Sequence, residues 1–432
     1  MKPSARLRTV LALLEAFFSE LSQPLDVLAG KHFRANRYIG AKDRRAIQET
    51  LYLLIRDYLA LAWKVEALSF DATPKAVLLL HLVETDAFEK GLFGGDQYGL
   101  EALNEEEGAL IKALAKNKPE APEWAKLNCP EWLYPEFLER FGDKTAEELQ
   151  SLNQRAPFTV RLNSLKGKLE DSAKDLAELG FQPTRYSPLG FTSQTPLALH
   201  NHPLFRDGKI EVQDEGSQLA MLLAGARPGM QVVDLCAGAG GKTLGLAAEM
   251  ANRGQIYAFD IDHRRLSQLG KRVQRAGVRN VQAAVLPADE KGRAALLQPL
   301  SGRIDRVILD LPCSGTGTWR RSPDGRFRLT GEKLKGYQEA QKALLAEGAG
   351  LVKSGGRLVY ITCSLLESEG EAQITGFLGA EEGWKCLDYR EILKDRGLRE
   401  IPESASHLPG CLLLTPVQHG CDGFFVCVLE KK

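Results

Sequence analysis

Hydrophobic residues recur at two different intervals along the chain, and the change of interval divides it into parts. Residues 5 to about 140 have helical spacing, with Gly, Asn and Asp in the loops and no strand-like alternation. The clearest predicted helices cover 42–68, where apolar side chains recur every three or four positions, and 73–88, where Pro74 is tolerated in the first turn. We therefore expect residues 1–145 to form an all-helical domain.

Strand-like patterns begin at Pro157. A strand over 158–162, a helix over 169–179 ended by Gly180 and a second strand over 181–186 predict a small α+β subdomain within residues 150–207. Strands and helices then alternate through residues 208–432: strands over 232–235, 255–259, 281–286, 307–311 and 357–362, and helices over 243–250, 264–276 and 334–352, the last closed by Ser354–Gly356. This order predicts an α/β domain with an open, mostly parallel sheet, whose ligands bind at the carboxyl ends of the strands.

Composition narrows the class of protein only slightly. The 432 residues are 44% hydrophobic and 26% charged, which excludes a disordered or fibrous chain. Residues 1–150 carry 19 basic and 24 acidic side chains, so with 56 of each overall the charge asymmetry is mild and any basic patch is local. The apolar runs are too short for a membrane span. The run over Val10–Leu14 is broken by Glu15 and no small-residue cleavage site follows, so we expect a helix there and not a signal peptide. The eight cysteines include no CxxC pair, which predicts neither a disulfide framework nor a metal site and suits a reducing, cytoplasmic setting.

A glycine-rich turn follows the first strand of the α/β domain, over Asp234–Thr243. A phosphate-binding P-loop would need glycine at position 236, which is Cys236, so that motif fails. A dinucleotide fingerprint would need glycine where Thr243 stands, which weakens that interpretation. The third alternative is S-adenosylmethionine, which has no pyrophosphate and does not require a phosphate cradle.

Acidic residues at successive strand ends favour the third alternative. Asp260 ends the second strand and is placed to accept hydrogen bonds from both ribose hydroxyls, while Asp289, after the third strand, could accept from an adenine amino group. Asp262 is expected to be a residue at a helix start. The competing interpretation is that these aspartates only cap helices and turns.

Two cysteines follow neighbouring predicted strands, in Asp310–Leu–Pro–Cys313 and in Thr362–Cys363. If the strands are adjacent, both thiols face one pocket. Carbon 5 of a pyrimidine is a poor nucleophile, but a thiolate that adds to carbon 6 makes carbon 5 reactive, and a second group must then help to remove its proton. Asp310 can hydrogen-bond the N3/N4 edge of cytosine. An amino-methylating enzyme would instead need a D/NPPY-like sequence at Asp310 and no thiol.

These residues resemble the RNA cytosine-5 methyltransferases of the RsmB/NOP/Sun family, and in particular its RsmB branch. The likeness extends to three minor motifs and, more loosely, to a NusB-like N-terminal domain: Arg161–Lys166, Val212–Gln218 and Asp422–Phe425, with Asp43–Arg45 and Tyr52–Arg56 in the helical part. The resemblance implies a Rossmann-like class I methyltransferase domain, a small RRM-like subdomain and S-adenosyl-L-methionine as the cofactor.

The resemblance also assigns roles. Cys363 is the expected nucleophile, and Cys313 assists removal of the proton or release of the product. The cofactor residues carried over are Cys236, Ala237, Gly238, Ala239, Gly240, Gly241, Lys242, Asp260, Asp289 and Asp310. Gly238 and Ala239 stand where the family commonly has Ala and Pro, so the backbone there is less rigidly fixed.

The expected partner is RNA, small-subunit ribosomal RNA in particular, with no DNA and no membrane, and the protein is expected to be a monomer. Arginines interleaved with aromatics over Trp319–Arg328 predict phosphate contact and base stacking, the competing interpretation being a solvated loop with a buried Trp. Two alternatives stay open: a transfer-RNA cytosine methyltransferase, and a non-catalytic ribosome-assembly or antitermination-type RNA binder.

Overall fold

The computed structural model describes all residues of the chain except 96, 196 and 198. The chain forms two compact units, Met1–Gln154 with Trp319–Gly331 and Arg155–Thr318 with Glu332–Lys432. No helix among the described residues combines the length and apolar character that crossing a bilayer requires.

The first unit is helical, as predicted. Its helices are α1 (Pro3–Ser19), α2 (Leu25–Ala35), α3 (Ala41–Ala67), α4 (Pro74–Glu84), α5 (Glu105–Lys116), α6 (Glu123–Lys126), α7 (Tyr134–Phe141), α8 (Thr145–Asn153) and α15 (Gly325–Arg328). The predicted helix over 42–68 matches α3, whose buried side chains recur at the expected interval from Ile47 to Val65. The helix predicted over 73–88 ends earlier, at Glu84, after starting at the N-cap Thr73.

The segment Trp319–Gly331 belongs to this helical unit, although it lies 165 residues beyond Gln154 in the chain. Phe327 makes edge contacts with Phe17, Phe18 and Tyr58. The Trp319 ring packs against Phe137, with ring centroids 5.8 Å apart. The segment therefore supplies part of the unit's hydrophobic core.

Polar contacts fix the same segment. The backbone N–H of Leu25 donates to Asp324 at 3.2 Å, and Arg326 donates to the carbonyl of Asn128 at 2.5 Å and to Asn153 at 2.6 Å. Arg326 and Trp319 are each only 1% exposed, and the guanidinium lies 4.7 Å from the indole centroid. The expectation that the Trp319 ring and Arg326 are presented to RNA is wrong, because both are used inside the helical unit.

The second unit contains two sheets. The smaller one has the order β2 (Gln182–Pro183), β3 (Gly190–Ser193), β1 (Phe158–Leu162) and β4 (Ile210–Val212), with α9 (Leu169–Glu178) packed on it. The strand predicted over 181–186 is reduced to the two residues of β2, because the backbone turns away after Pro183. Gly180 follows α9 with φ +82°, as its role in ending the helix requires.

The larger sheet has the order β10-β12-β9-β8-β5-β6-β7, with β11 also paired to β12. Its strands are β5 (Gln231–Asp234), β6 (Gln255–Asp260), β7 (Val281–Val285), β8 (Ile304–Asp310), β9 (Val352–Thr362), β10 (Trp384–Leu387), β11 (Leu412–Leu414) and β12 (Phe424–Lys431). The pairs from β7 to β9 are parallel, as predicted, and β12 runs antiparallel to β9.

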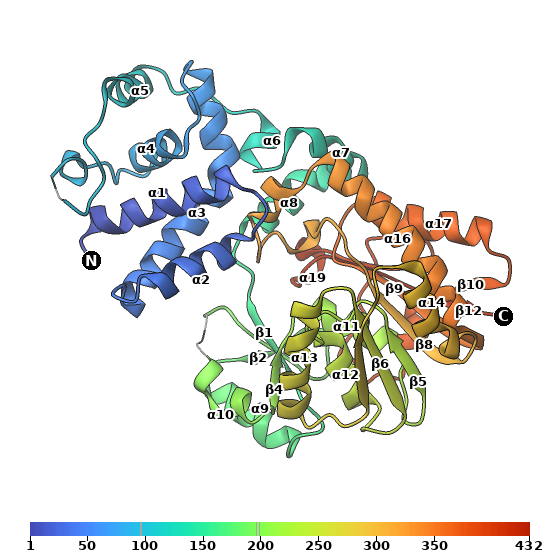
Figure 1. Ribbon diagram of the computed structural model, residues 1–432. Coiled ribbons are helices and arrows are strands. Elements are labelled where there is room, and N and C mark those ends of the chain that lie inside the picture. Colours follow the sequence, from blue (N-terminus) through green and yellow to red (C-terminus); the bar gives the residue numbers. More distant parts are fainter. Residues whose placement is uncertain (96, 196, 198) are drawn as a thin grey trace. The chain divides into compact units, whose positions relative to one another are not determined.

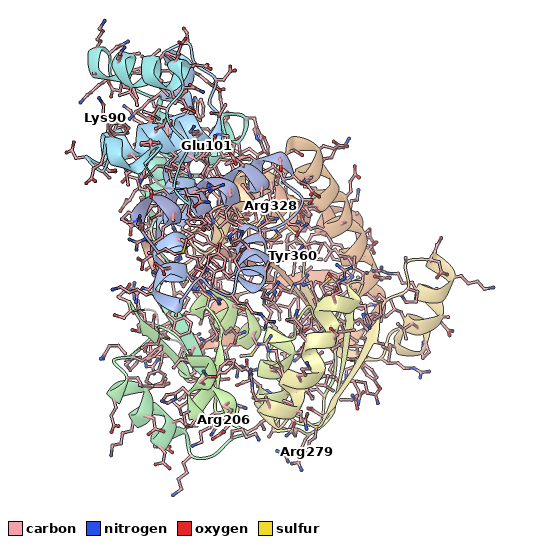
Figure 2. All side chains as sticks on the ribbon, turned by 60° about the vertical axis from the view of Figure 1, so that its left-hand side comes forward. Lys90, Glu101, Arg206, Arg279, Arg328 and Tyr360 are labelled. Atoms are coloured by element: carbon pink, nitrogen blue, oxygen red, sulfur yellow. The ribbon has the colours of Figure 1, made fainter. Side chains whose placement is uncertain are left out.

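Helices pack along this larger sheet (Figure 1): α11 (Glu215–Leu223), α12 (Gly241–Glu249), α13 (His263–Ala276), α14 (Glu290–Leu297), α16 (Gly331–Leu351), α17 (Glu371–Ala380) and α18 (Tyr389–Leu393). Figure 2 shows Tyr360 of β9 inside the unit, whereas Arg206 and Arg279 project from its surface. The direction of strand order changes at β5, which pairs with β6 on one side and β8 on the other. In parallel sheets, the carboxyl end of such a switch point is where ligands bind.

The start of β9 departs from the prediction, whereas its end at Thr362 agrees with it. Helix α16 ends at Leu351, and the strand already begins at Val352, so Ser354–Gly356 lies inside the strand and does not form a separate helix cap. Gly355 has φ +69°, and the register against β8 shifts between Ile304 and Arg306. The glycines therefore accommodate an irregularity at the start of the strand, and the pairing beyond it is regular.

Replacing Trp319 by Ala is expected to destabilise the helical unit by about 3–5 kcal/mol, because it removes a large, fully buried ring. The measurement is urea unfolding followed by circular dichroism. The matched control is Trp132→Ala, since Trp132 is 43% exposed and its removal should cost less than about 1 kcal/mol. Equal losses for the two variants would contradict the buried role of Trp319.

Candidate methyl-transfer site

The glycine-rich turn runs from the end of β5 to the start of α12. Gly238 and Gly240 both have positive φ, +54° and +88°, and a Cβ on Gly240 would lie 2.1 Å from Leu269 Cδ1. Glycine is therefore required at position 240 for two independent reasons. A Cβ on Gly241 would meet no atom within 4 Å, so the backbone at the N-terminus of α12 borders open space.

Asp260 at the end of β6 fixes the other side of this turn. It is 4% exposed; its Oδ2 accepts from the Gly238 N–H and its Oδ1 from the Asp262 N–H, both at 2.7 Å. Each carboxylate oxygen keeps a second lone pair for another donor. Asp262 caps α13, as expected, by accepting from the N–H groups of Arg264 and Arg265.

Asp289 is exposed and caps α14, its Oδ1 accepting from the Gly292 N–H at 2.7 Å. Asp289 thus has the helix-capping role of the competing interpretation. A role in binding the cofactor stays a prediction for this residue.

Asp234 and Cys236 lie beneath the turn. Burial, first of all, raises the pKa of Asp234 to about 7, although its Oδ2 accepts from the Thr243 hydroxyl at 2.6 Å. Among the described residues, none forms a hydrogen bond with its Oδ1. Burial also raises the pKa of the Cys236 thiol well above its ordinary value, and neighbouring aspartates act in the same direction. Cys236 therefore stays a neutral thiol and is not a nucleophile.

The two cysteines singled out from the sequence lie side by side. Strands β8 and β9 are parallel neighbours, with Asp310 paired to Ile361, and the Leu311 N–H continues the ladder by donating to the Ile361 carbonyl at 2.9 Å. Cys313 and Cys363 each come two residues beyond that bond. Their Sγ atoms are 3.4 Å apart, and both side chains are partly exposed. Adjacency of the two strands, on which the prediction depended, is confirmed.

The hydrogen bond that Cys313 makes with Cys363, and then burial, raise the pKa of Cys313 well above that of a free thiol. Cys313 therefore keeps its proton near neutral pH.

Asp310 lies at the end of β8 beside this pair. Its Oδ2 is 2.7 Å from Lys242 Nζ, and its side chain is 36% exposed whereas that of Lys242 is 7% exposed. The Lys242 ammonium also lies 5.3 Å from the Phe424 ring centroid. The buried Lys242 therefore links the glycine-rich turn to the end of β8. It also orients the Asp310 carboxylate, which remains accessible to solvent.

Buried polar residues that the sequence did not single out hold the two cysteine loops. Glu369 is fully buried; it accepts from the Ser314 N–H at 2.9 Å and from Gln341 at 3.0 Å, and the Ser314 hydroxyl also donates to it. Ser314 and Ser364, which follow the two cysteines, have their hydroxyl oxygens 3.2 Å apart. The repeated Cys–Ser pair is the sequence signal that could have indicated this contact.

Backbone contacts link the last minor motif, Asp422–Phe425, here called the closing motif, to the same loops. The Gly317 N–H donates to the Cys363 carbonyl at 3.0 Å, and the Gly423 N–H donates to the Gly317 carbonyl at 2.8 Å. A Cβ on Gly317 would lie 2.4 Å from the Gly423 carbonyl oxygen. The Asp422 N–H in turn donates to Asp214 at 3.0 Å, which joins two of the minor motifs.

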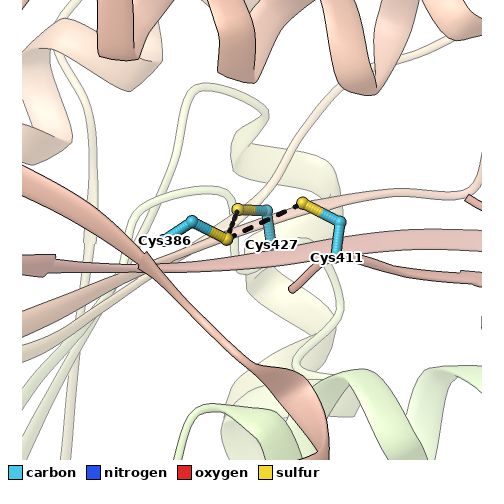
Figure 3. A group of neighbouring side chains, drawn as sticks. All are labelled: Cys386, Cys411 and Cys427. Carbon is cyan, nitrogen blue, oxygen red and sulfur yellow. Dashed lines mark hydrogen bonds between the residues drawn. The ribbon is translucent and has the colours of Figure 1, made fainter. Parts of the chain in front are cut away.

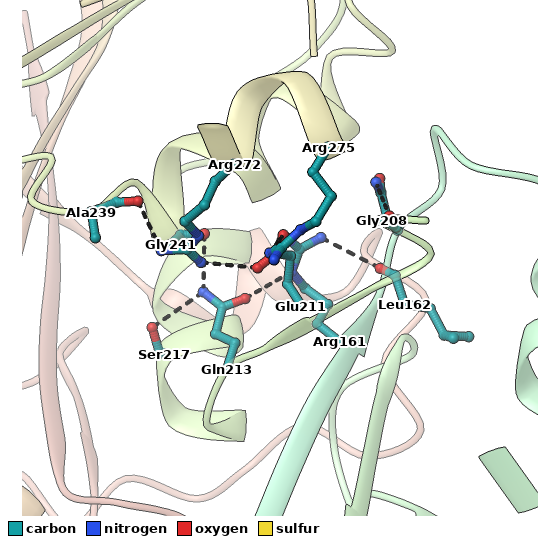
Figure 4. A network of polar contacts seen from close by, with 11 residues as sticks. Arg161, Leu162, Gly208, Glu211, Gln213, Ser217, Ala239, Gly241, Arg272 and Arg275 are labelled. Carbon is teal, nitrogen blue, oxygen red and sulfur yellow. Dashed lines mark hydrogen bonds and ion pairs between the residues drawn. The ribbon is translucent and has the colours of Figure 1, made fainter. Parts of the chain in front are cut away.

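A polar network from the small sheet supports the glycine-rich turn (Figure 4). Glu211 of β4 is 3% exposed and pairs with Arg272 at 3.0 Å and Arg275 at 2.5 Å. Arg272 also donates to the Ala239 carbonyl at 2.8 Å. The carboxylate therefore positions an arginine that holds the turn, a contact that links residues far apart in the sequence.

Residues of the first minor motif, Arg161–Lys166, belong to the same polar network. Arg161, 2% exposed, donates through Nε to Gln213 at 2.7 Å, and Gln213 donates to the Gly241 carbonyl at 3.4 Å. Asn163 donates to the carbonyls of Gly208 and Ala276 at 2.8 and 2.9 Å. These motif residues join the small sheet to the start of α12 and the end of α13.

The glycine-rich turn, the acidic strand end and the switch point together define a Rossmann-like methyltransferase domain. The family model described as 16S rRNA methyltransferase RsmB/F matches residues 220–430, and a ferredoxin-like domain model of RsmF/B-like proteins matches residues 129–200. The chain belongs to the RsmB/F family of methyltransferases.

Individual proteins show the same relationship. A probable ribosomal RNA small subunit methyltransferase B from Synechocystis sp. is 35% identical over 306 residues, which are 70% of this chain and 66% of that protein. A ribosomal RNA small subunit methyltransferase B from Klebsiella pneumoniae is 31% identical over 79% of this chain and 73% of that protein. A solved methyltransferase homolog from Pyrococcus horikoshii is 28% identical, with a TM-score of 0.61 over 72% of this chain and 98% of that one.

The cofactor of this methyltransferase family is S-adenosyl-L-methionine, and the residues present fit it. The open space at Gly241, the left-handed glycines before it and the buried carboxylate of Asp260 together provide backbone donors and an acceptor pair. Which of the residues from Cys236 to Lys242, with Asp260, Asp289 and Asp310, contact the cofactor stays a prediction.

Replacing Gly240 by Ala is expected to destabilise the second unit by more than about 1 kcal/mol, because alanine disfavours φ +88° and its Cβ would overlap Leu269. Gly241→Ala is the matched control, since a Cβ there meets nothing. Thermal unfolding of the two variants checks the difference. A Gly240→Ala protein as stable as the control would show that the turn is not held as described.

Asp234→Asn is expected to change how stability depends on pH. Because the pKa of Asp234 is about 7 in the folded protein against 3.8 ordinarily, the wild-type protein loses stability as pH rises from about 4 to 7 and the carboxyl ionises in its buried place. Asp234→Asn lacks this loss. Its free energy of unfolding relative to that of wild type should therefore rise across that range, by up to about 4 kcal/mol. Unfolding curves at pH 5 and 8 measure it, and a difference independent of pH would contradict the assignment.

Proposed function

We propose that this protein is an S-adenosyl-L-methionine-dependent RNA cytosine-C5 methyltransferase that acts on 16S ribosomal RNA through a transient covalent bond. The observation that carries the proposal is the 3.4 Å separation of the Cys313 and Cys363 sulfurs at the carboxyl ends of adjacent strands. A single cysteine at a strand end would call for no chemical explanation, but two partly exposed thiols beside an accessible carboxylate do.

Cys363 is the proposed nucleophile. Its thiolate adds to carbon 6 of cytosine, which forms a carbon–sulfur bond and moves electron density to carbon 5. The retention of the proton by Cys313, which its raised pKa indicates, supports this choice between the two sulfurs. When bound, S-adenosyl-L-methionine supplies an electrophilic methyl group.

Cys313 is proposed to act in the second half of the reaction. The carbon 5 proton must leave, and the electron pair of that C–H bond then expels the Cys363 thiolate from carbon 6. Once Cys363 is bonded to carbon, Cys313 releases its own proton to solvent, and the resulting thiolate takes the proton from carbon 5 and becomes a thiol again.

Asp310 is proposed to hydrogen-bond the N3/N4 edge of the base, with Lys242 holding the carboxylate in place at 2.7 Å. The base must leave any stack to reach these groups, which favours a loop or junction of folded RNA. The choice of small-subunit ribosomal RNA is supported by the names of the relatives from Synechocystis and Klebsiella. A reducing, cytoplasmic setting suits a reaction that depends on free thiols.

The covalent step is tested with cysteine variants and ribosomal RNA. Cys313→Ala should accumulate a protein–RNA species that survives denaturing electrophoresis, because release is slowed, and Cys363→Ala should form none and lose methylation by at least about a hundredfold. Cys421→Ala is the matched control, a buried cysteine outside the pair, and should behave as wild type. Normal methylation by Cys363→Ala, with no adduct in either variant, would end the proposal.

The substrate is tested separately by bisulfite sequencing of ribosomal and transfer RNA from cells with and without the gene. Loss of a 5-methylcytosine from 16S ribosomal RNA is expected. Loss from a transfer RNA instead would keep the mechanism and replace the substrate. Full rescue of the deletion by Cys363→Ala would favour a non-catalytic RNA-binding role.

A further inference from the structure

Three cysteines that the methyl-transfer site does not use lie together near the C-terminus (Figure 3). They are Cys386, Cys411 and Cys427, separated in the sequence by 25 and 41 residues from Cys386. The sequence spacing gave no metal-ligand pattern, because the residues come from three different strands or strand ends. Their convergence is a product of the fold.

Strand pairing explains why they meet. Strand β12 pairs along one stretch with β11, at Phe424–Val426, and along the next with β10, at Val428–Lys431. Cys427 is the residue between these two stretches. Cys411 directly precedes β11, and the register Leu412↔Val426 continues to place it opposite Cys427.

Cys386 reaches the same place from β10. It pairs with Leu429, which is two residues from Cys427 and so on the same face of β12. The three side chains therefore converge near Cys427, the point where β12 stops pairing with β11 and begins to pair with β10.

The sulfur positions match a metal site better than a disulfide. Cys386 Sγ lies 3.5 Å from Cys427 Sγ and 3.9 Å from Cys411 Sγ, and all three sulfurs are within 4.8 Å of one another. Thiolates bound tetrahedrally to zinc at about 2.3 Å are separated by about 3.8 Å. A disulfide needs about 2.05 Å and would leave the third sulfur unused.

The surrounding backbone is shaped around the cluster. Gly410 has φ +84°, and a Cβ there would lie 2.9 Å from Cys386 Sγ, so only glycine allows this loop to bring Cys411 close. Cys411 and Cys427 are buried, and Cys386 is partly exposed. Pro409, Gly410 and Cys411 also line a surface pocket next to the cluster.

We propose that Cys386, Cys411 and Cys427 bind a zinc ion that joins β10 and β11 to β12. Cysteine thiolates are soft ligands that favour zinc over magnesium or calcium. Three sulfurs are the ligands that the described residues offer here, so the fourth ligand of a tetrahedral ion comes from solvent. Binding displaces the thiol protons into solvent and leaves the oxidation states unchanged. The proposal is independent of the methyl-transfer chemistry.

The test is the zinc content of the full-length protein after growth with zinc and purification without chelators. The expected result is one zinc per chain, reduced at least tenfold in Cys386→Ser, the variant best tolerated because Cys386 is partly exposed. Cys421→Ser and Cys129→Ser, which remove buried cysteines outside the cluster, should retain it. Circular dichroism confirms that each variant is folded.

A second measurement identifies the ligands. Cobalt exchanged into the wild-type protein should give sulfur-to-cobalt charge-transfer bands, which Cys386→Ser weakens and Cys421→Ser keeps. Chelation of the zinc should lower the melting temperature of wild type but not of Cys386→Ser. Wild-type protein without zinc, retention of zinc by Cys386→Ser, or a native mass lower by two hydrogens, which indicates a disulfide, would each overturn the proposal.

Discussion

Parallel pairing of β8 with β9 is the interaction on which the proposed chemistry depends. The ladder between the two strands continues as far as the bond from the Leu311 N–H to the Ile361 carbonyl. Because strand neighbours are about 4.8 Å apart, thiols at matching positions beyond that bond are brought within contact distance without any special loop. A slip of one residue in this register would turn one of the two thiols toward the opposite face of the sheet.

Contacts around Cys313 and Cys363 stabilise this register. Glu369 holds the first cysteine loop through Ser314, and the close approach of Gly317 and Gly423 clamps the loop against the closing motif. The cofactor turn is held from the other side by Arg272, which Glu211 orients from the small sheet. The small subdomain thus contributes to the site by positioning the turn.

The features that the sequence predicted depend on local patterns. Apolar periodicity located α3 and the central strands, and the strand-end positions of Cys313 and Cys363 were enough to expect their convergence. The role of Trp319–Arg328 could not be predicted, because arginines next to aromatics suit both an RNA surface and a buried cation–π core. Nor could the three-cysteine cluster, because it depends on which stretch of β12 each neighbouring strand occupies.

Because Trp319–Gly331 packs with the helical unit, the two units cannot be separated by a single cut in the chain. The helical unit is encoded in two separate stretches, and the second one leaves the methyltransferase unit only a few residues after Cys313. Cutting the gene after Gln154 would therefore not yield two independent modules. The shortened catalytic piece would expose Trp319 and Phe327 to solvent, and these apolar rings would favour self-association. The isolated helical piece would have a cavity where the two side chains pack in the full-length chain.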